Sequence, residues 1–444
     1  MKYNILVLCD FNRRSANTII DHATSFKKYS CHNIFYVNPV RNNKPEWLNL
    51  SKFDVLILHY SIYVLGDHYL NPSWRHSIRV SPAVKIQFIQ DEYRRVNEVI
   101  DRMKELGINI LYTCFPEQEM EKVYPADKLP GVMKINTLTG YVPSYLENRV
   151  LDLQGRRPID VGYRGRGEGF WWLGTLYQEK SFIGREFLHR AAKTELTCDI
   201  STREEDRIYG RRWVQFLRQC RCTLGTESGA SVIDFTGQIE DQVRQYCEQH
   251  PSATFEVVRA RFFKDIEGQI RMNQISPRVF ESIGCGCALI LFEGEYSKIL
   301  TPDVHFIPLK KDFSNIENVF DKIRDRAFIR EMAERSYEDI LRSGAYSYQA
   351  FISSFDKNLG DYMGSSAGQH AIPATDLTGS RTYIRMFNIT AKLFMFLCRK
   401  FGRILTYLYR ILHRLFHLLK QLIQFHPFFL SEKLKLMLKT IRQA

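Results

Sequence analysis

The strongest constraint on the fold is a series of short, continuous apolar runs separated by polar stretches of helix length. Continuous runs are typical of strands buried on both faces, and their alternation with helix-length segments is typical of parallel strands joined by crossover helices. In the first 150 residues the runs are YNILVLC (3–9), NIFYV (33–37), DVLILHY (54–60), VKIQFI (84–89) and INILYT (108–113). They predict an α/β domain with a doubly wound parallel sheet.

A second series of apolar runs begins after a polar break at 147–158. Its runs are IDVGY (159–163), TELTCDI (194–200), RCTLGT (221–226), CALILF (287–292) and VHFIPL (304–309). We therefore expect two Rossmann-like domains that face a cleft, over residues 1–155 and 156–358. Because ligands of open α/β sheets bind at the carboxyl ends of the strands, the functional residues should follow these runs.

The net charge of +13 is concentrated at the C-terminal end of the chain, where residues 381–444 hold thirteen Lys and Arg against one acid. A Gly/Ser/Thr-rich stretch at 359–382 predicts a flexible linker, and 383–444 predict a basic amphipathic helical tail. Bases mixed with Leu and Phe are typical of a helix that lies on a membrane, so we expect segment 383–425 to bind a membrane surface. A helix packed on a partner protein or on nucleic acid is the alternative.

Nothing at the N-terminus resembles a signal peptide, because the apolar run before Asp10 has only five residues. We therefore expect a cytoplasmic protein, bound peripherally to the inner face of the membrane, with reduced cysteines. The pairs Cys220/Cys222 and Cys285/Cys287 lack the spacing of structural zinc sites, so we interpret them as packing residues and expect no metal. A body without a basic face also leads us to expect no nucleic-acid partner.

The stretch ISPRVFESIGCGCALILF (275–292) predicts a short helix followed at once by a strand. Ser276 is a good N-cap residue, and Pro277 suits the first helical position. A helix N-terminus with Arg278 in its first turn makes a phosphate site, and Glu281 can accept two hydrogen bonds from a ribose diol. The stretch therefore predicts a nucleotide half-site, although a surface Arg–Glu pair is the common alternative.

This stretch resembles the nucleotide-sugar segment of GT-B glycosyltransferases and is most similar to the bacterial group 1 (family 4-like) enzymes. The following stretch, YSKILTPDVHFIPLKKDFSNIENV (296–319), resembles the next segment of such proteins. The resemblance implies a GT-B fold with an N-terminal acceptor domain and a C-terminal donor domain. It also implies that Glu281 binds the donor ribose and that Arg278 lies near the donor phosphates.

The family's second basic pair would fall within YRGRGEGFWWLGTLYQEKS (163–181), where the candidates are Arg164 or Arg166, and Lys180. GT-B enzymes stabilise the leaving diphosphate with such cations and a helix dipole rather than with a metal. The chain also has no compact D-x-D motif. The resemblance therefore implies metal-independent transfer from a nucleotide diphosphate sugar, with no cofactor.

The sequence departs from the family pattern at one position. Members with the E-x7-E motif carry a second glutamate eight residues before the one that matches Glu281, where this chain has Asn273. Glu227 and Glu267 are nearby alternatives, and we favour Glu227 as a donor-binding residue because it follows a predicted strand. The departure leaves a retaining or an inverting outcome open.

An inverting enzyme needs a base that takes the acceptor's proton, and three candidates follow strands of the first domain. His59 follows DVLIL, and Asp91 and Glu92 follow VKIQFIQ. A histidine satisfied within the core is the alternative for His59, and a helix cap is the alternative for Asp91.

Together these patterns predict a glycosyltransferase that acts on an envelope glycan or a lipid-linked saccharide in polysaccharide biosynthesis. A non-catalytic GT-B-like protein that binds a glycan or a protein partner is the alternative from another class, which the departure at Asn273 keeps open. A nucleotide-sugar epimerase, which shares the two-domain fold, is the nearest enzymatic alternative.

Overall fold

The computed structural model describes residues 2–10, 17–46, 48–147, 151, 153 and 155–365. The tail expected at 383–444, with its membrane-binding segment 383–425, lies outside the described residues, as does the part of the expected linker after residue 365. Within the described ranges, each helix is too short or too polar to cross a lipid bilayer.

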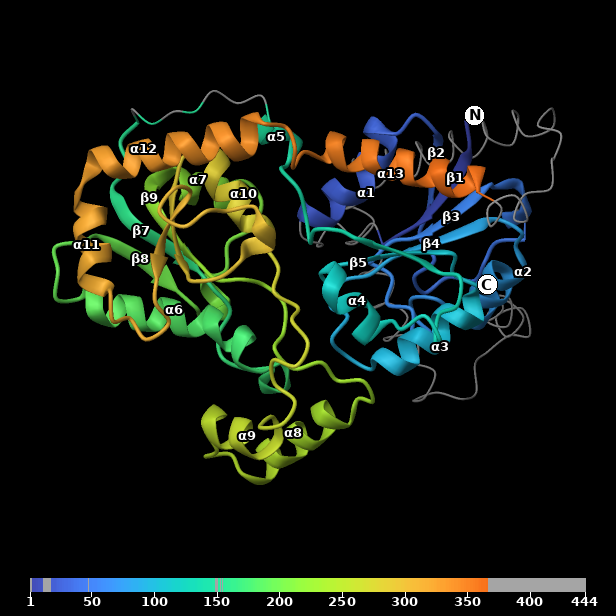
Figure 1. The fold of residues 1–444 in the computed structure, drawn as a ribbon, viewed down its shortest axis with the longest axis horizontal. Helices are drawn as coiled ribbons and strands as arrows, with labels where there is room; N and C mark the ends of the chain where they lie inside the picture. Colours follow the sequence, from blue (N-terminus) through green and yellow to red (C-terminus); the bar gives the residue numbers. More distant parts are fainter. Residues whose placement is uncertain are drawn as a thin grey trace, which may run out of the picture. The chain divides into compact units, whose positions relative to one another are not determined.

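The first domain is built on a six-stranded parallel sheet with the strand order β2-β1-β3-β4-β5-β6 (Figure 1). The strands are β1 (Asn4–Leu8), β2 (Asn33–Val37), β3 (Val55–Leu58), β4 (Val84–Phe88), β5 (Ile110–Thr113) and β6 (Met133–Asn136). The first five coincide with the predicted runs, and all of them except β2 are fully buried. Strand β6 lies at the sheet edge and is partly exposed, so its sequence MKIN shows no continuous apolar run.

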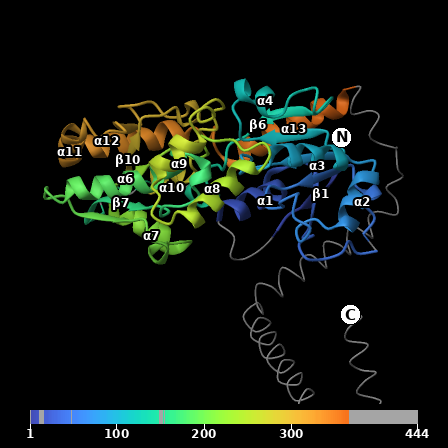
Figure 2. The ribbon, with the colours of Figure 1, turned by 90° about the horizontal axis from the view of Figure 1, so that it is seen from below.

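Two helices from opposite ends of the body pack together on one face of this sheet. Helix α1 (Asn17–Tyr29) contacts α13 (Tyr348–Gly364), and Phe351, Phe355 and Leu359 of α13 lie in the same hydrophobic core as Ile5 and Val7 of β1. In both views the orange α13 lies among the blue and cyan elements of the first domain (Figures 1 and 2).

The position of α13 corrects two expected boundaries. Residues 348–358, which we assigned to the second domain, belong to the core of the first, and residues 359–364 of the expected linker continue the same helix. An amphipathic pattern shows that a helix buries one face, but it does not show against which sheet. The other helical segments before residue 150 are α2 (Pro72–Val80), α3 (Val96–Leu106), α4 (Glu117–Val123), α5 (Ser144–Glu147) and the 3₁₀ turn η1 (Leu50–Lys52).

The second domain is built on a five-stranded parallel sheet with the strand order β11-β10-β9-β7-β8. The strands are β7 (Ile159–Arg164), β8 (Cys198–Ser201), β9 (Cys220–Gly225), β10 (Ala288–Phe292) and β11 (Phe306–Leu309). All five coincide with predicted runs. The expected class of two doubly wound α/β domains is therefore confirmed.

Helices cover both faces of the second sheet, as the fully apolar strand β10 requires. Ala288 and Ile290 pack with α6 (Thr175–Ala191), α11 (Ile316–Arg324) and α12 (Arg326–Ser336). Leu289 and Leu291 face the other way and pack with α7 (Arg211–Gln219), α10 (Pro277–Gly284) and the π-helical turn η5 (Tyr337–Arg342). Alternate residues of one strand thus serve two cores, which is why the run is continuous rather than alternating.

A helical pair, α8 (Gln238–Gln249) and α9 (Phe255–Phe262), is inserted between β9 and α10. Its Val243 and Val258 form a small core with Trp172 and Leu173 of the 3₁₀ turn η2 (Trp171–Leu173). Arg94 of the first domain reaches this insertion, because its guanidinium donates two hydrogen bonds, of 2.6 and 2.7 Å, to the carboxylate of Glu240. The remaining short turns are η3 (Glu204–Asp206) and η4 (Tyr296–Lys298).

Candidate active site

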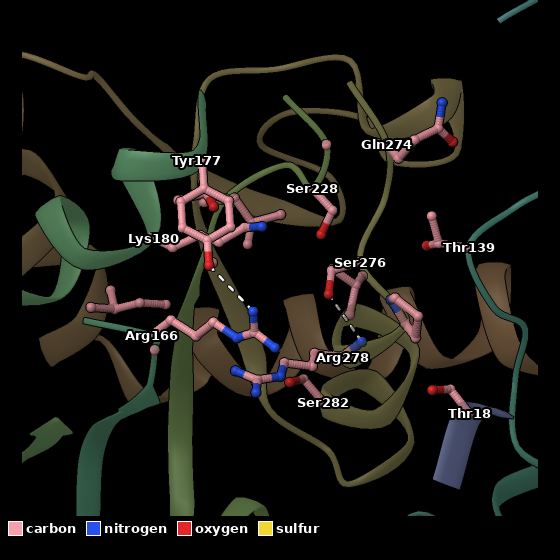
Figure 3. A pocket seen from close by; sticks show the side chains of 18 of the residues that line it. Thr18, Thr139, Arg166, Tyr177, Lys180, Ser228, Gln274, Ser276, Arg278 and Ser282 are labelled. Carbon is pink, nitrogen blue, oxygen red and sulfur yellow. Dashed lines mark hydrogen bonds between the residues drawn. The ribbon is translucent and has the colours of Figure 1, made fainter. Parts of the chain in front are cut away.

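A cavity of about 350 Å³ lies between the carboxyl ends of the strands of the two sheets (Figure 3). Gln90 and Asp91, which follow β4, line it from the first domain, and Arg166 and Thr226, which follow β7 and β9, line it from the second. This is the position at which open α/β sheets bind their ligands.

The N-terminus of α10 opens into this cavity. Ser276 caps the helix, and its hydroxyl oxygen accepts a 3.4 Å hydrogen bond from the backbone N–H of Arg278. Pro277 occupies the first helical position, as predicted, and Ser282 of the second turn also lines the cavity. The remaining N–H groups of the first turn and the helix dipole favour an anion at this end of the helix.

Two cations project into the cavity from the segment that follows β7. Arg166 donates a 3.3 Å hydrogen bond to the hydroxyl of Tyr177, and the Lys180 ammonium lies 4.7 Å from the centre of the Tyr177 ring. Burial, and after it the neighbouring charge of Arg166, lower the pKa of Lys180 to about 8. A bound anion would relieve this crowding of positive charge.

Arg278 supplies the third cation of the cavity. Its guanidinium donates to the backbone carbonyl of Arg164 and lies 5.3 Å from the centre of the Trp213 ring. Figure 3 shows the guanidinium groups of Arg166 and Arg278 pointing into the same space. The structure therefore brings together three of the predicted donor-binding residues, Arg166, Lys180 and Arg278.

Arg278 lines the cavity, but Glu281, one turn further along α10, does not. Its carboxylate is buried and accepts a 2.8 Å hydrogen bond from the indole N–H of Trp213. Burial raises the pKa of Glu281, while the bond from Trp213 and the charge of Arg278 act in the opposite direction. Trp213 thus contacts both predicted residues of α10, although no motif in the sequence singles it out.

Arg164 does not line the cavity. It is the last residue of β7, and its guanidinium pairs with Asp199 at 2.8 Å and lies 4.3 Å from the centre of the Phe216 ring. A residue still within a strand has its side-chain direction fixed by the pleat, and this one faces α7. Of the two arginines proposed for this loop, Arg166 is therefore the one that faces the cavity.

Glu227 also does not line the cavity. One carboxylate oxygen accepts hydrogen bonds from the backbone N–H groups of Glu295 (3.1 Å) and Tyr296 (2.8 Å), and the other accepts one from the Asn273 amide at 2.7 Å. Asn273, where the sequence departs from the family pattern, thus donates a hydrogen bond to Glu227, which we named as the alternative to the missing glutamate. A carboxylate held in this way stabilises the loops around it and has little capacity left for a sugar.

His59 is fully buried among the core residues of the first domain. Its Nε2 lies 3.0 Å from Nδ1 of His22, and its Nδ1 accepts a 3.1 Å hydrogen bond from the backbone N–H of Ser61. Burial lowers the pKa of His59 well below its usual range and that of His22 to about 3. This is the alternative that the sequence left open, a histidine satisfied within the core, and it argues against a catalytic role.

The two acids that follow β4 have different surroundings. Asp91 lines the cavity, has a left-handed backbone (φ +52°) and accepts a 2.7 Å hydrogen bond from the hydroxyl of Tyr93. Glu92 is buried, and burial raises its pKa to about 7. Its carboxylate accepts three hydrogen bonds of 2.6 Å, from Thr113 Oγ1, the Cys114 backbone N–H and Tyr124 Oη. Of the three first-domain candidates, Asp91 is therefore the one that lines this cavity.

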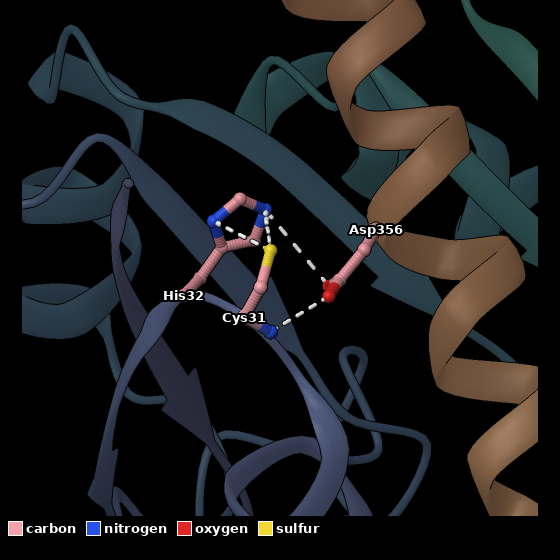
Figure 4. Close-up of side chains that lie close together, drawn as sticks. All are labelled: Cys31, His32 and Asp356. Atoms are coloured by element: carbon pink, nitrogen blue, oxygen red, sulfur yellow. Dashed lines mark hydrogen bonds and ion pairs between the residues drawn. The ribbon is translucent and has the colours of Figure 1, made fainter. Parts of the chain in front are cut away.

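Within the described ranges, one group of side chains has the composition of a metal site: Cys31, His32 and Asp356 (Figure 4). The backbone N–H of Tyr3 donates to Nδ1 of His32 at 3.3 Å, so this nitrogen is an acceptor and the neutral ring carries its proton on Nε2, which faces Asp356 at 3.9 Å. A metal on Nε2 would need the opposite tautomer. We interpret the group as a polar contact between α13 and the turn before β2.

No family model matches the chain, and no curated protein matches it by sequence. Solved structures match at low identity. T4 phage BGT in complex with UDP-glucose aligns over 82% of this chain and 100% of its own, with 11% identity and a TM-score of 0.45. Anabaena HepE in complex with UDP and glucose aligns over 81% and 100%, with 9% identity and a TM-score of 0.42. The pneumococcal O-GlcNAc transferase GtfA aligns over 72% and 58%, with 13% identity and a TM-score of 0.34.

Proposed function

We propose that this chain is a glycosyltransferase that moves a sugar from a nucleoside diphosphate donor to an envelope glycan or a lipid-linked saccharide. The observation that carries the proposal is the convergence of Arg166, Lys180 and Arg278 at the N-terminus of α10, in a cavity bordered by strand ends of both domains. Three cations and a helix dipole fit a diphosphate, which carries two or three negative charges.

In the reaction, the bond between the sugar's anomeric carbon and the diphosphate oxygen breaks, and a bond from the acceptor oxygen to that carbon forms. Negative charge builds on the departing diphosphate, where Arg166, Lys180 and Arg278 offset it without a metal ion. The acceptor hydroxyl gives its proton to Asp91 in an inverting reaction, or to the departing phosphate in a retaining one. The donor is a substrate, and the chemistry calls for no cofactor.

The proposal includes a place for the reaction. The basic, leucine- and phenylalanine-rich composition of 383–425 supports peripheral binding to the inner face of a membrane, which would hold the cavity near an envelope acceptor. Removal of residues 383–444 should therefore abolish binding to anionic vesicles and leave nucleotide binding intact. Retention of vesicle binding by the shortened chain would contradict this part of the proposal.

Thermal unfolding of the full chain in the presence of UDP, GDP, ADP or CDP, and of their sugars, tests the donor site. A ligand at a hundred times its Kd stabilises the folded state by about 2.7 kcal/mol. We expect a rise in the unfolding midpoint with one nucleotide, and we expect Arg278→Ala to abolish it. Arg185→Ala is the matched control, because Arg185 pairs with Glu168 and does not line the cavity.

The outcomes separate the proposed function from its rivals. If no nucleotide raises the midpoint, the donor site is refuted, and a non-catalytic glycan- or partner-binding protein replaces the transferase. The hydrogen bond from Asn273 to Glu227, at the position where the family pattern departs, favours that alternative. Release of free nucleoside diphosphate only when an acceptor is present identifies a transferase, whereas conversion of the donor sugar without an acceptor identifies an epimerase.

A further inference from the structure

A second cavity, of about 600 Å³, lies at the other end of the second sheet from the candidate active site, and we call it the basic cavity. Its lining comes from the amino ends of the strands: Arg157 precedes β7, Thr197 precedes β8, Arg221 is near the start of β9, and Gly286 precedes β10. The six residues of β7 span about 20 Å. A ligand in the basic cavity therefore lies far from the cations that follow the carboxyl ends of the strands.

The basic cavity is strongly positive. Among the residues that the structure describes, its lining includes five arginines, which are Arg156 and Arg157 of the segment that joins the two domains, Arg221 of β9, and Arg326 and Arg330 of α12. The acids of the lining are Asp160 and Glu195, so these charged residues carry a net charge of +3. Ile329 and Ala333 of α12 contribute apolar wall. A hollow with charge of one sign and apolar walls concentrates ions of the opposite sign.

Two of the arginines are held in fixed positions by the protein. Arg157 donates 2.7 Å hydrogen bonds to the backbone carbonyls of Cys220 and Cys285, and Arg221 pairs with Asp160. The side chain of Arg221 is only 14% exposed. Because these guanidinium groups are positioned before a ligand arrives, little conformational entropy is lost from them on binding.

The other three arginines, Arg156, Arg326 and Arg330, are exposed and make no hydrogen bond or ion pair with any residue of the described ranges. Exposed arginines nearby behave differently: Arg324 of α11 pairs with Asp321, and Arg335 of α12 pairs with Glu331. Within α12, Arg326 and Arg330 are four residues apart and share one face, where like charges repel each other. A bound anion would relieve this repulsion.

The chemistry of the guanidinium group indicates which anion fits. Arginine binds phosphate oxygens through two parallel hydrogen bonds, and two linked phosphate groups present enough oxygens for several arginines at once, whereas a carboxylate has only two. The C-terminal end of the chain does not supply such an anion, because residues 381–444 contain thirteen Lys and Arg against one acid. The ligand is therefore a separate molecule.

We propose that the basic cavity binds a small soluble anion with two linked phosphate groups. Arg156, Arg326 and Arg330 contact the phosphates from the rim, and Arg157 and Arg221 form the fixed floor. The charge of such an anion, about two or three negative charges at neutral pH, balances the net charge of the lining. The inference goes beyond the proposed function and stands without it, because the two cavities lie at opposite ends of the sheet.

Calorimetric titration of inorganic pyrophosphate into the full chain, with and without saturating UDP, tests the site. The other probes are inorganic phosphate, citrate as a trianion without phosphorus, and vesicles of phosphatidylcholine with phosphatidic acid, in which a lipid carries the phosphate. We expect pyrophosphate to bind when UDP is present and to bind more tightly than phosphate or citrate.

Substitutions on α12 locate the binding. Arg326→Gln and Arg330→Gln should each raise the Kd for pyrophosphate about tenfold. Neither should lower the unfolding midpoint of the unliganded protein, because neither arginine has a partner to lose. Arg330→Lys keeps the charge but loses the planar fork, so it should raise the Kd about threefold. Arg335→Gln is the matched control, because it removes one charge from the same helix at an exposed position outside the cavity, and it should leave the Kd unchanged.

Three results would overturn the inference. If Arg330→Gln and Arg335→Gln weaken binding equally, the attraction is a general effect of surface charge rather than a site. If citrate binds as tightly as pyrophosphate and with the same losses, the site does not recognise phosphate. If Arg326→Gln and Arg330→Gln weaken the binding of vesicles but not of pyrophosphate, the arginines contact a membrane and not a small anion.

The same data judge the proposed function separately. If pyrophosphate binds with the expected losses in the α12 variants but no nucleotide raises the unfolding midpoint, the basic cavity stands and the donor site is refuted. If UDP or Arg278→Ala abolishes all pyrophosphate binding while Arg326→Gln and Arg330→Gln leave it unchanged, the donor site stands and the basic cavity is refuted.

Discussion

Lys180 makes nucleotide affinity depend on pH in a direction that the structure fixes. Burial and the neighbouring arginines lower its pKa to about 8 in the free protein. A bound diphosphate stabilises the charged ammonium and raises this pKa, so binding takes up a proton whenever the pH lies above about 8. Affinity for UDP should therefore be constant at lower pH and should fall as the pH rises through that value.

The size of this effect follows from the protonated fraction of Lys180. With a pKa of about 8, that fraction falls about tenfold, from about 0.9 at pH 7 to about 0.1 at pH 9. The Kd for UDP should therefore rise about tenfold over this range, or about 1.4 kcal/mol. A complex in which Lys180 stayed away from the phosphates would show a much smaller change.

Calorimetric titration of UDP into the full chain at pH 7, 8 and 9, in buffers of different ionisation enthalpy, measures both the affinity and the proton uptake. Lys180→Arg is the control, because its side chain remains charged at every pH and the nucleotide's own titration is common to both proteins. We expect the extra slope and the proton uptake to vanish in this variant. An equal slope in both proteins would show that Lys180 is not the titrating group and would refute the assignment.

Three further perturbations follow from the contacts described above. Asn273→Asp puts a second carboxylate against Glu227. We expect this substitution to lower the free energy of unfolding, measured by urea titration, by about 2 kcal/mol at neutral pH and by less in mild acid. An unchanged stability would contradict the like-charge argument. Glu240→Gln leaves Arg94 and Arg244 without the carboxylate that pairs with them. Because both arginines are partly exposed, we expect the free energy of unfolding to fall by about 1–2 kcal/mol in the same assay, which is less than for a fully buried pair. Glu92→Gln removes a carboxyl whose pKa in the folded state is raised to about 7. The stability of the wild-type protein should therefore be greatest below about pH 4.5, and it should decline relative to the variant by roughly 3 kcal/mol as the pH rises through 7. Parallel curves of stability against pH for the two proteins would refute the raised pKa.

The parts of the fold that were predictable from the sequence are those that a local pattern determines. Strands buried on both faces produce continuous apolar runs, whereas the polar edge strand β6 does not. The partner of α13 was not predictable, since its apolar face would suit either core. His59 illustrates the consequence, because its ring packs on His22 of α1, which in turn packs on Phe351 of α13.

The same distinction holds for the candidate site. Arg166 and Arg278 were predictable because a residue after a strand or in the first turn of a helix projects toward the carboxyl edge of the sheet. Arg164, two residues earlier, is still part of β7 and is directed toward α7 instead. Trp213 carries no motif, since its contacts with Glu281 and Arg278 are formed only when α7 and α10 pack together.

The packing of α13 on the first sheet has a consequence for the order in which the chain folds. Synthesis produces the strands of the first domain early, but Phe351, Phe355 and Leu359, which close one face of their core, are made last within the body. Until then the apolar face around α1 stays exposed, and a long sequence separation slows its closure. We therefore expect a nascent or truncated chain that ends before residue 348 to bind chaperones or aggregate, and the second domain, whose core is contiguous in sequence, to become protease-resistant first.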